Sequence, residues 1–398
     1  MDEPTQPQSN QDAQPGVQSL RELLNLVSGR TAPSNAPQEE SGLVEKQPFP
    51  FLGLVGQVEM RLALLLSLVN PATGGVLLIG PRGTGKTTAV RSLLGLLPDI
   101  ERSACFYGCM PEDIELDGID AVCPDCARKY GEGTPLSIVS PVRMIELPLN
   151  SRLEDVIGGL DERSALHERM RLRRGVLAQA DRNILYVDEV NLIEDSIVNA
   201  ILDAAALGSY TLRRGALTAT YHSRFTLIGS MNPEEGNLRS QIMDRFGLRV
   251  IVRGLEDTQQ RLEAYNRVRS YHQSPNQLVA QYSGETSLAR QEIQQARQRL
   301  NQVQLPKETA EAGICLIRKL GIDSLRAEIT WFEAARAHAA ADGRTVVDLH
   351  DLRITAAMAL RLRQSTFMTD YLGERQREDE GLMAALAQIV PEEGKNDE

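Results

Sequence analysis

Short apolar runs mark the first two thirds of the chain, and long helical patterns fill the rest. The runs VLLI (76–79) and ILYV (184–187) show no alternation, which is typical of strands buried on both faces of a parallel sheet. Segments 142–147 and 225–230 predict further strands, and 209–223 predicts a hairpin around Arg213, Arg214 and Gly215. Strands separated by helical segments predict an α/β fold.

Helical periodicity covers most of the remaining middle of the chain. We expect helices at 57–71, from 87, from 153, and at 193–207, 257–271, 288–303, 306–319, 325–342 and 349–363. The last three form a compact unit. The Gln- and Arg-rich 288–303 segment lacks a sustained heptad, which favours a solvated linker helix over a coiled coil.

Both ends of the chain are acidic. Residues 1–48 hold seven acids against three bases, and 366–398 hold nine against three, so the tails account for nearly all of the net charge of −11. We predict disordered tails, in which 19–29 is either a docking helix or a transient one and 382–390 is a loose apolar stretch. Bulk composition therefore shows no basic stripe for nucleic acid. The chain has neither a membrane-spanning apolar run nor a targeting peptide pattern, which favours a cytoplasmic location.

The strand at 76–79 leads into GPRGTGKT, which fills every fixed position of the phosphate-binding pattern G-x-x-x-x-G-K-[ST]. Its glycines let backbone N–H groups turn toward phosphate oxygens, and the next helix points its positive end at the same anion. Lys86 is expected to neutralise the β- and γ-phosphates, and Thr87 to bind Mg²⁺. The expected nucleotide-binding residues are Gly80, Pro81, Arg82, Gly83, Thr84, Gly85, Lys86, Thr87 and Thr88.

Polar residues follow two of the other predicted strands. Asp188 and Glu189 come directly after 184–187, at the carboxyl end where α/β sheets bind ligands. We expect Asp188 to hold Mg²⁺, mainly through water, and Glu189 to polarise the attacking water. Asn232 follows 225–230 and can sense the γ-phosphate, although Asn before Pro is also an ordinary turn.

Two arginines are candidates for completing the site. Arg245 lies near the end of a predicted helix at 238–247 and, in a ring, can stabilise transition-state charge on a neighbour's nucleotide. A salt bridge to Asp244 or to another local carboxylate is the alternative. Arg326 begins the helix at 325–342 and is either a further phosphate sensor or an exposed helix-start arginine.

Four of the five cysteines lie in 99–140, where the pattern predicts irregular structure. Cys105-x₃-Cys109 and Cys123-Pro-Asp-Cys126 are separated by thirteen residues, which fits a structural zinc site with four thiolates. Reduced thiols and redox pairing or a cluster are the alternatives, and a structural disulfide is disfavoured in a cytosolic protein. Cys315 falls on a predicted helix, where we expect it to be buried.

The order of these elements resembles that of AAA+ ATPases: a P-loop, a DE pair, an asparagine, the arginine of DRF and a helical lid. More narrowly, the chain resembles the AAA+ I subunit of magnesium chelatases over about 48–365. The segments that carry this resemblance are PFLGLVGQVEMRLALLLSLVNPATGGVLLIGPRGTGKTTAVRSLLGLLP, YVDEVNLIEDSIVNAILD, IGSMNPEEGNLRSQIMDRFGL and SLRAEITWFEAARAHAAADGR.

The resemblance implies an AAA+ P-loop parallel sheet sandwiched by helices and followed by an all-α C-terminal helical lid. Composition and resemblance together predict a disordered acidic tail at 1–48, an ATPase core at 49–255 with a cysteine-rich insertion at 99–140, linker helices at 256–304, a helical bundle at 305–365 and an acidic tail at 366–398. Neither tail takes part in the resemblance. The resemblance also implies roles of sensor 1 for Asn232, arginine finger for Arg245 and sensor 2 for Arg326. Arg239 is a further ring-interface candidate, Gly56 and Gln57 fall on the adenine side, and the hairpin at 209–223 corresponds to the pre-sensor insertion.

The implied function is an ATP- and Mg²⁺-dependent ring, usually a hexamer, that works with a D subunit and a porphyrin-binding H subunit. ATP hydrolysis by such a ring drives Mg²⁺ insertion into protoporphyrin IX in (bacterio)chlorophyll synthesis. One alternative is a MoxR-like ATPase that acts on another metal-dependent client. An MCM-like nucleic-acid translocase that uses Arg213 and Arg214, and a nucleotide-gated scaffold, are the others.

Overall fold

The computed structural model describes residues 47–105, 107–160, 172–215, 217–363 and 380 of the 398 residues. The predictions for 19–29 and 382–390 lie outside these residues. Among the described residues, no helix is long and apolar enough to cross a membrane.

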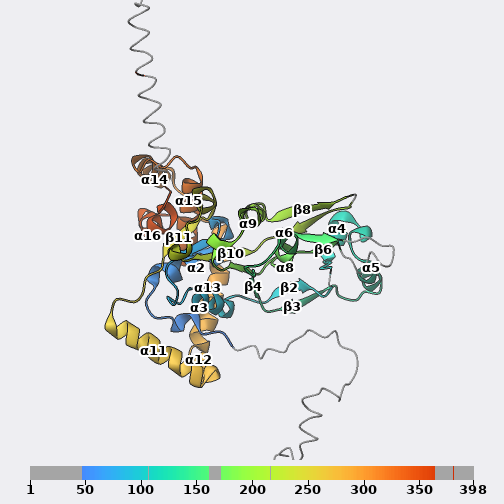
Figure 1. The fold of residues 1–398 in the computed structure, drawn as a ribbon, viewed down its shortest axis with the longest axis horizontal. Helices are drawn as coiled ribbons and strands as arrows, with labels where there is room; N and C mark the ends of the chain where they lie inside the picture. Colours follow the sequence, from blue (N-terminus) through green and yellow to red (C-terminus); the bar gives the residue numbers. More distant parts are fainter. Residues whose placement is uncertain (1–46, 106, 161–171, 216, 364–379, 381–398) are drawn as a thin grey trace, which may run out of the picture. The chain divides into compact units, whose positions relative to one another are not determined.

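The centre of the fold is a sheet of five parallel strands in the order β11–β1–β10–β7–β4. Figure 1 labels β11, β10 and β4 of this sheet. The strands are β1 (Val76–Ile79), β4 (Met144–Glu146), β7 (Ile184–Val187), β10 (Thr226–Met231) and β11 (Leu248–Ile251). The four strands predicted from the sequence are confirmed. The fifth, β11, was not predicted because Arg249 interrupts its apolar run, yet this side chain is fully buried beside Asp244.

Helices cover both faces of the sheet, which confirms the predicted sandwich. Successive strand residues face opposite sides, so Leu78 belongs to one core cluster while Leu77 and Ile79 belong to the other. The first cluster includes residues of α2 (Val58–Val69), α3 (Lys86–Ser92), α13 (Ser283–Leu300), α14 (Lys307–Lys319), α15 (Arg326–Ala341) and α16 (Leu349–Leu360). The second includes residues of α8 (Val176–Gln179), α9 (Asp195–Leu207) and α10 (Ser240–Arg245).

The C-terminal helices pack directly on the sheet layer, with α15 against α2 and α16 against β11. They are preceded by α11 (Thr258–Gln273) and α12 (Pro275–Gln281). The prediction of a solvated linker at 288–303 is wrong, because α13 buries Ile293 and Ala296 against α2 and α15. Arg297 also donates its Nε–H to the Leu68 carbonyl at 2.7 Å. The polar composition of α13 hides this narrow apolar stripe.

The prediction of irregular structure at 99–140 is also wrong. This insertion contains β2 (Ile100–Ser103), α4 (Pro111–Asp117), α5 (Pro124–Gly131) and β3 (Ser137–Ser140), and β2 pairs with β3. Its elements are short because they pack on a small core built largely from cysteines, which no apolar periodicity reveals.

Smaller elements complete the fold. The helix predicted from 153 is only α6 (Leu153–Ile157), which is followed by β5 (Gly158–Leu160), and β5 pairs with β6 (Leu172–Arg174). The predicted hairpin is confirmed as β8 (Ser209–Arg214) and β9 (Leu217–His222). Short 3₁₀ turns lie at Phe51–Gly53, Pro71–Thr73, Leu93–Leu96, Ile119–Ala121, Val190–Leu192 and Pro233–Glu235.

Candidate functional site

The loop between β1 and α3 has the backbone shape of a phosphate cradle. Gly83 and Gly85 have φ angles of 78° and 84°, a left-handed conformation that side chains other than hydrogen rarely allow. A Cβ atom on Gly80 would lie 2.1 Å from the Val252 carbonyl oxygen, so this position also requires glycine. Each of the three glycines therefore has a physical reason to be present in this loop, either its backbone conformation or the close approach of another segment.

Lys86, the first residue of α3, points its ammonium group into the loop. Its Nζ donates to the carbonyl oxygens of Gly80 at 2.6 Å and Pro81 at 2.8 Å. Partial burial lowers the pKa of Lys86, and the charges of Asp188 and Glu189 oppose that shift. The ammonium group thus lies where phosphate oxygens would replace carbonyl oxygens as its partners.

Asp188 and Thr87 meet at the carboxyl ends of three adjacent strands. The Thr87 hydroxyl lies 3.0 Å from the Tyr186 hydroxyl, which donates to Asp188 Oδ1 at 2.9 Å. The Ser230 hydroxyl, on β10, donates to the same carboxylate oxygen. Hydroxyl and carboxylate oxygens are the ligands that Mg²⁺ prefers, so the residues present fit this ion.

Sequence reasoning missed Tyr186 and Ser230. Burial raises the pKa of Tyr186 to about 12, which keeps its hydroxyl protonated as a donor to Asp188. The one available signal was a phenol within an otherwise aliphatic buried strand, since a buried tyrosine hydroxyl needs a partner.

Glu189 is held by an arginine of the phosphate loop. Arg82 Nη2 lies 2.8 Å from Glu189 Oε1, and Arg82 Nε lies 2.7 Å from Glu235 Oε1. The Glu189 backbone is left-handed, with φ of 49°, an unusual state for a residue with a side chain. This turn aims the carboxylate toward the phosphate loop instead of along the strand.

These residues line one cleft of about 400 Å³. Its walls are Arg82, Gly83, Thr84, Gly85, Lys86, Thr87, Thr88, Asp188, Glu189, Ser230, Met231 and Asn232. Asn232 is 4% exposed, and its Oδ1 accepts from the Glu234 backbone N–H at 3.3 Å. The sequence offered two interpretations of Asn232, a γ-phosphate sensor and an ordinary turn before proline. Both are compatible, because the side chain forms the turn and also lines the cleft.

A second cavity, of about 320 Å³, borders the other side of the phosphate loop. It shares Gly83, Thr84, Gly85 and Thr88 with the cleft and adds mostly apolar walls, together with Gln57. Gln57 Nε2 donates to the Arg253 carbonyl at 2.5 Å. Neighbouring Gly56 has a φ of 62°, a left-handed conformation that favours glycine, and a Cβ there would also lie 2.6 Å from Leu255 Cδ2. This cavity next to the phosphate cradle therefore suits the planar ring of a nucleotide base.

The predicted arginines do not line either cavity. Arg245 Nη1 donates to Asp203 Oδ1 at 2.7 Å, and Arg326 Nη1 donates to Asp244 Oδ2 at 3.2 Å. Arg239 pairs with Asp195. The alternative of a salt bridge between Arg245 and a nearby carboxylate is confirmed, with Asp203 as the partner. Asp244 is not that partner, because it contacts Arg249, Arg326 and Arg363.

The remaining candidates lie farther along the insertions. At the hairpin, Arg214 Nη2 lies 3.5 Å from Glu154 Oε1, while Arg213 is exposed. All five cysteines lie in the described part of the chain and none forms a disulfide. The prediction that Cys315 is buried is wrong, because α14 turns it to solvent.

The phosphate cradle, the strand-end carboxylates and the helical lid define a P-loop ATPase of the AAA+ class. The profile described as "AAA lid domain" matches residues 310–381, and that described as "Magnesium chelatase, subunit ChlI" matches 164–246. The chain belongs to the magnesium chelatase ChlI/BchI subunit family.

Relatives match most of the chain. The magnesium-chelatase subunit ChlI homolog of Methanocaldococcus jannaschii is 39% identical, over 83% of this chain and 90% of its own length. The magnesium-chelatase 38 kDa subunit of Rhodobacter capsulatus is 40% identical, over 84% and 93%. A chain in a structure of the complex between subunits BchI and BchD of magnesium chelatase is 38% identical, over 80% and 97%, with a TM-score of 0.46.

Proposed function

We propose that this chain is the ATP-hydrolysing subunit of a magnesium chelatase and drives Mg²⁺ insertion into protoporphyrin IX. The observation that carries the proposal is the single cleft that joins Lys86, Asp188, Glu189 and Asn232. Membership in the chelatase subunit family supplies the substrate class. We assign porphyrin binding to the H subunit and ATP hydrolysis to this chain.

Each residue of the cleft has a role that its position supports. Lys86 and the backbone N–H groups of the loop bind the β- and γ-phosphates. Thr87 and Asp188 hold Mg²⁺, which neutralises phosphate charge when bound. Glu189 polarises the attacking water, and Asn232 orients that water against the γ-phosphate. Gly56 and Gln57 border the base.

We assign Arg245 and Arg326 to the nucleotide of a neighbouring subunit in a homo-oligomeric ring, most simply a hexamer. Their guanidinium groups lie outside the cleft of their own chain, which supports action across an interface. Arg239 belongs to the same interface. The ring is expected to be cytoplasmic and to work with D and H subunits.

The deciding experiment combines the purified chain with D and H subunits, ATP and protoporphyrin IX, and measures Mg-protoporphyrin by fluorescence. We expect product only when all three proteins and ATP are present. Glu189→Gln is the control, because it should bind ATP yet yield neither phosphate nor product. Product formation at the wild-type rate with Glu189→Gln would refute the role of Glu189.

The rival functions give different results in the same assays. ATPase activity that rises with single-stranded or duplex DNA and ignores D and H subunits would favour a translocase that uses Arg213 and Arg214. Activity that responds to neither would favour a MoxR-like remodeller with another client.

A further inference from the structure

The cysteine-rich insertion brings four thiols together at one point. The Sγ atoms of Cys105, Cys109, Cys123 and Cys126 all lie within 4.8 Å of one another, and the Cys105 and Cys123 sulfurs are 3.6 Å apart. A tetrahedral Zn²⁺ with bonds of about 2.3 Å places its sulfur ligands about 3.8 Å apart. We propose that these four cysteines bind one structural Zn²⁺ ion, a site that the ATPase function does not require.

Backbone donors around the sulfurs support this assignment. The N–H groups of Tyr107, Cys123 and Cys126 donate to the sulfurs of Cys105, Cys109 and Cys123 at 3.3, 3.2 and 3.4 Å. Donors aimed at sulfur stabilise thiolate, the form that binds metal. In both cysteine pairs a sulfur accepts from the N–H two or three residues later, so each turn is shaped around its first cysteine.

The packing of the insertion explains why a metal is needed there. Among its described residues, its core contains Cys109, Cys123 and Cys126 but only two other buried apolar residues, Val122 and Leu136. So small a core buries too little apolar surface to order a segment of this length, and metal binding compensates for that. Iron–sulfur clusters place cysteines on different irons around a larger inorganic core, so the close sulfur spacing favours a single ion.

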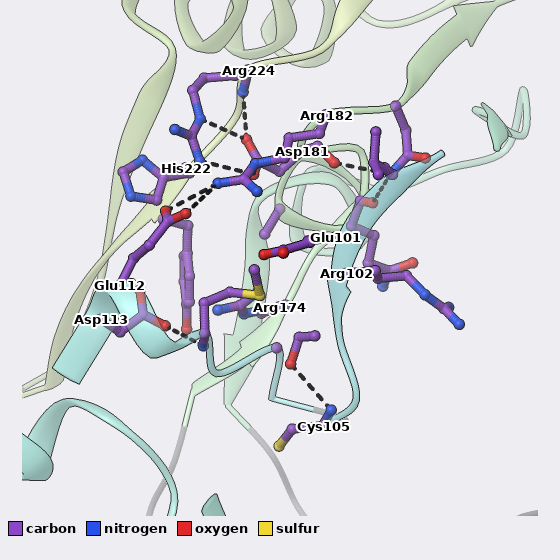
Figure 2. Close-up of a pocket in the computed structure, with 18 of the residues that line it drawn as sticks. Glu101, Arg102, Cys105, Glu112, Asp113, Arg174, Asp181, Arg182, His222 and Arg224 are labelled. Atoms are coloured by element: carbon purple, nitrogen blue, oxygen red, sulfur yellow. Dashed lines mark hydrogen bonds and ion pairs between the residues drawn. The ribbon is translucent and has the colours of Figure 1, made fainter. Parts of the chain in front are cut away.

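The cysteine-rich insertion also contacts other elements of the ATPase core, among them the hairpin of β8 and β9. Gly108 lies against the guanidinium of Arg174, whose Nη1 would be 1.8 Å from a Cβ on Gly108. Arg174 in turn lies over the ring of Tyr221 on β9, with its Cζ 5.2 Å from the ring centroid. Figure 2 shows the pocket at this place, of about 250 Å³, whose lining includes Arg174, Cys105 of the insertion and His222 of the hairpin.

A second contact ties the insertion to the base of β7. Arg182 Nη2 donates to both carboxylate oxygens of Glu112, at 2.8 and 3.0 Å, as the dashed lines in Figure 2 mark. Arg182 lies two residues before β7, whose other end leads to Asp188 and Glu189. The zinc ion therefore stabilises an insertion that contacts two other elements. The insertion reaches the hairpin through Arg174, and it reaches the strand that precedes the catalytic carboxylates through the Glu112–Arg182 pair.

The test begins with metal analysis of the full-length protein purified without chelator. We expect about one equivalent of zinc per chain, and the absorption bands of tetrahedral thiolate–Co²⁺ after exchange with Co²⁺. The double variant Cys123→Ser/Cys126→Ser should lose both signals. Cys315→Ser is the matched control, because this exposed cysteine lies outside the cluster, and it should keep both.

Wild-type results alone can overturn the proposal, so it does not depend on whether the double variant folds. Zinc below about half an equivalent without Co²⁺ thiolate bands, or iron in place of zinc, would refute it. Zinc retained by the double variant would refute the ligand set. Zinc removal should also speed trypsin cleavage at Arg128 and Lys129 in α5, and unchanged cleavage would refute the stabilising role.

Discussion

Replacing Asp244 by asparagine tests how the arginine-bearing helix α10 is fixed to the lid. The Asp244 carboxylate lies 2.8 Å from Arg363 Nη1 and 3.4 Å from Arg249 Nη2, and both arginine side chains are fully buried. It also accepts from Ser324 Oγ at 3.0 Å and from Arg326. Burial would raise the pKa of Asp244, but the charge of Arg363 and these hydrogen bonds lower it. The carboxylate is therefore ionised at neutral pH.

The expected loss of unfolding free energy follows from the two buried arginines, which lose their charged partner when Asp244 is replaced by asparagine. Removing one partner of a buried ion pair typically costs about 3–5 kcal/mol, because the other charge stays buried and unpaired. Backbone carbonyls still accept from Arg249 at 2.7 Å and from Arg363 at 2.7 Å, which compensates both groups in part. We therefore expect Asp244→Asn to lower the free energy of unfolding by about 3 kcal/mol, the lower end of that range.

The assay is urea unfolding followed by the fluorescence of Trp331, the sole tryptophan of the chain, which is buried in α15. Asp203→Asn is the matched control, because its carboxylate is 63% exposed and pairs with Arg245 at the surface. Its cost should be within about 1 kcal/mol. The reasoning would be refuted if Asp244→Asn lay within about 1 kcal/mol of the wild type, or if both variants were destabilised equally.

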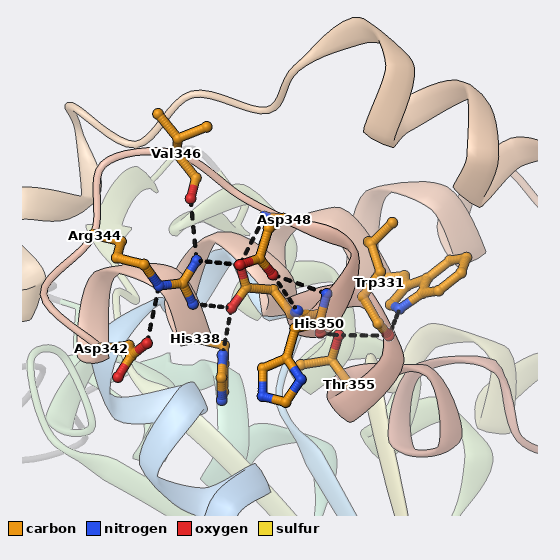
Figure 3. Close-up of polar contacts among 10 residues, drawn as sticks. Trp331, His338, Asp342, Arg344, Val346, Asp348, His350 and Thr355 are labelled. Atoms are coloured by element: carbon orange, nitrogen blue, oxygen red, sulfur yellow. Dashed lines mark hydrogen bonds and ion pairs between the residues drawn. The ribbon is translucent and has the colours of Figure 1, made fainter.

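Three further predictions concern the cleft, the interface and the lid. Lys86→Ala should abolish ATP binding measured by nucleotide titration, because no other ammonium group lines the cleft in the described part of the chain; undiminished affinity would contradict the phosphate assignment. Arg245→Ala should spare ATP binding but lose ring-dependent hydrolysis, and rings mixed with Lys86→Ala subunits should show whether it acts across the interface. In the lid, burial opposes ionisation of Asp351, but hydrogen bonds from Arg344, the Asp348 backbone and His338 lower its pKa to about 2. Figure 3 shows Arg344, His338 and Asp348 within this group of polar contacts. A folded-state pKa below the ordinary 3.8 stabilises the protein by about 2 kcal/mol above that pH, and this contribution is lost as pH falls from about 4 to 2. Asp351→Asn should therefore be less stable at pH 7 and converge on the wild type in acid, and a pH-independent gap in urea midpoints would count against this account.

The parts of the fold that the sequence could predict are local. The cradle from Gly80 to Thr87 is one continuous motif, and Asp188 and Asn232 are adjacent to strands that a short apolar run or pattern reveals. Parallel packing then brings these strand ends together, since Ile79 pairs with Met231 and Val187 pairs with Gly229. Motif and topology together thus suffice to place the main cleft residues.

What the sequence could not predict depends on partners far away in the chain. In the sequence, Arg249 breaks an apolar run. The fold shows that Asp244 and the carbonyl oxygens at 361 and 362 accept hydrogen bonds from its guanidinium group. The insertion at 99–140 has no apolar period because cysteines form most of its core. In both places a polar or reactive side chain is buried by specific contacts, and such contacts leave no periodic pattern.

Arg245 and Arg326 also show the difference between a local motif, which the sequence reveals, and a contact between distant residues, which only the fold reveals. A motif can identify Arg245, but only the fold shows that Asp203 holds it outside its own cleft, at a surface where an ion pair is worth about 0–1 kcal/mol. In the ring that we propose, releasing Arg245 toward a neighbouring phosphate would therefore cost little, and a charge-assisted bond to phosphate would replace the lost contact. Arg326 shares Asp244 with two buried arginines, so Asp244 stays paired when Arg326 leaves. Both arginines are thus held in place by partners that can release them without unfolding the lid.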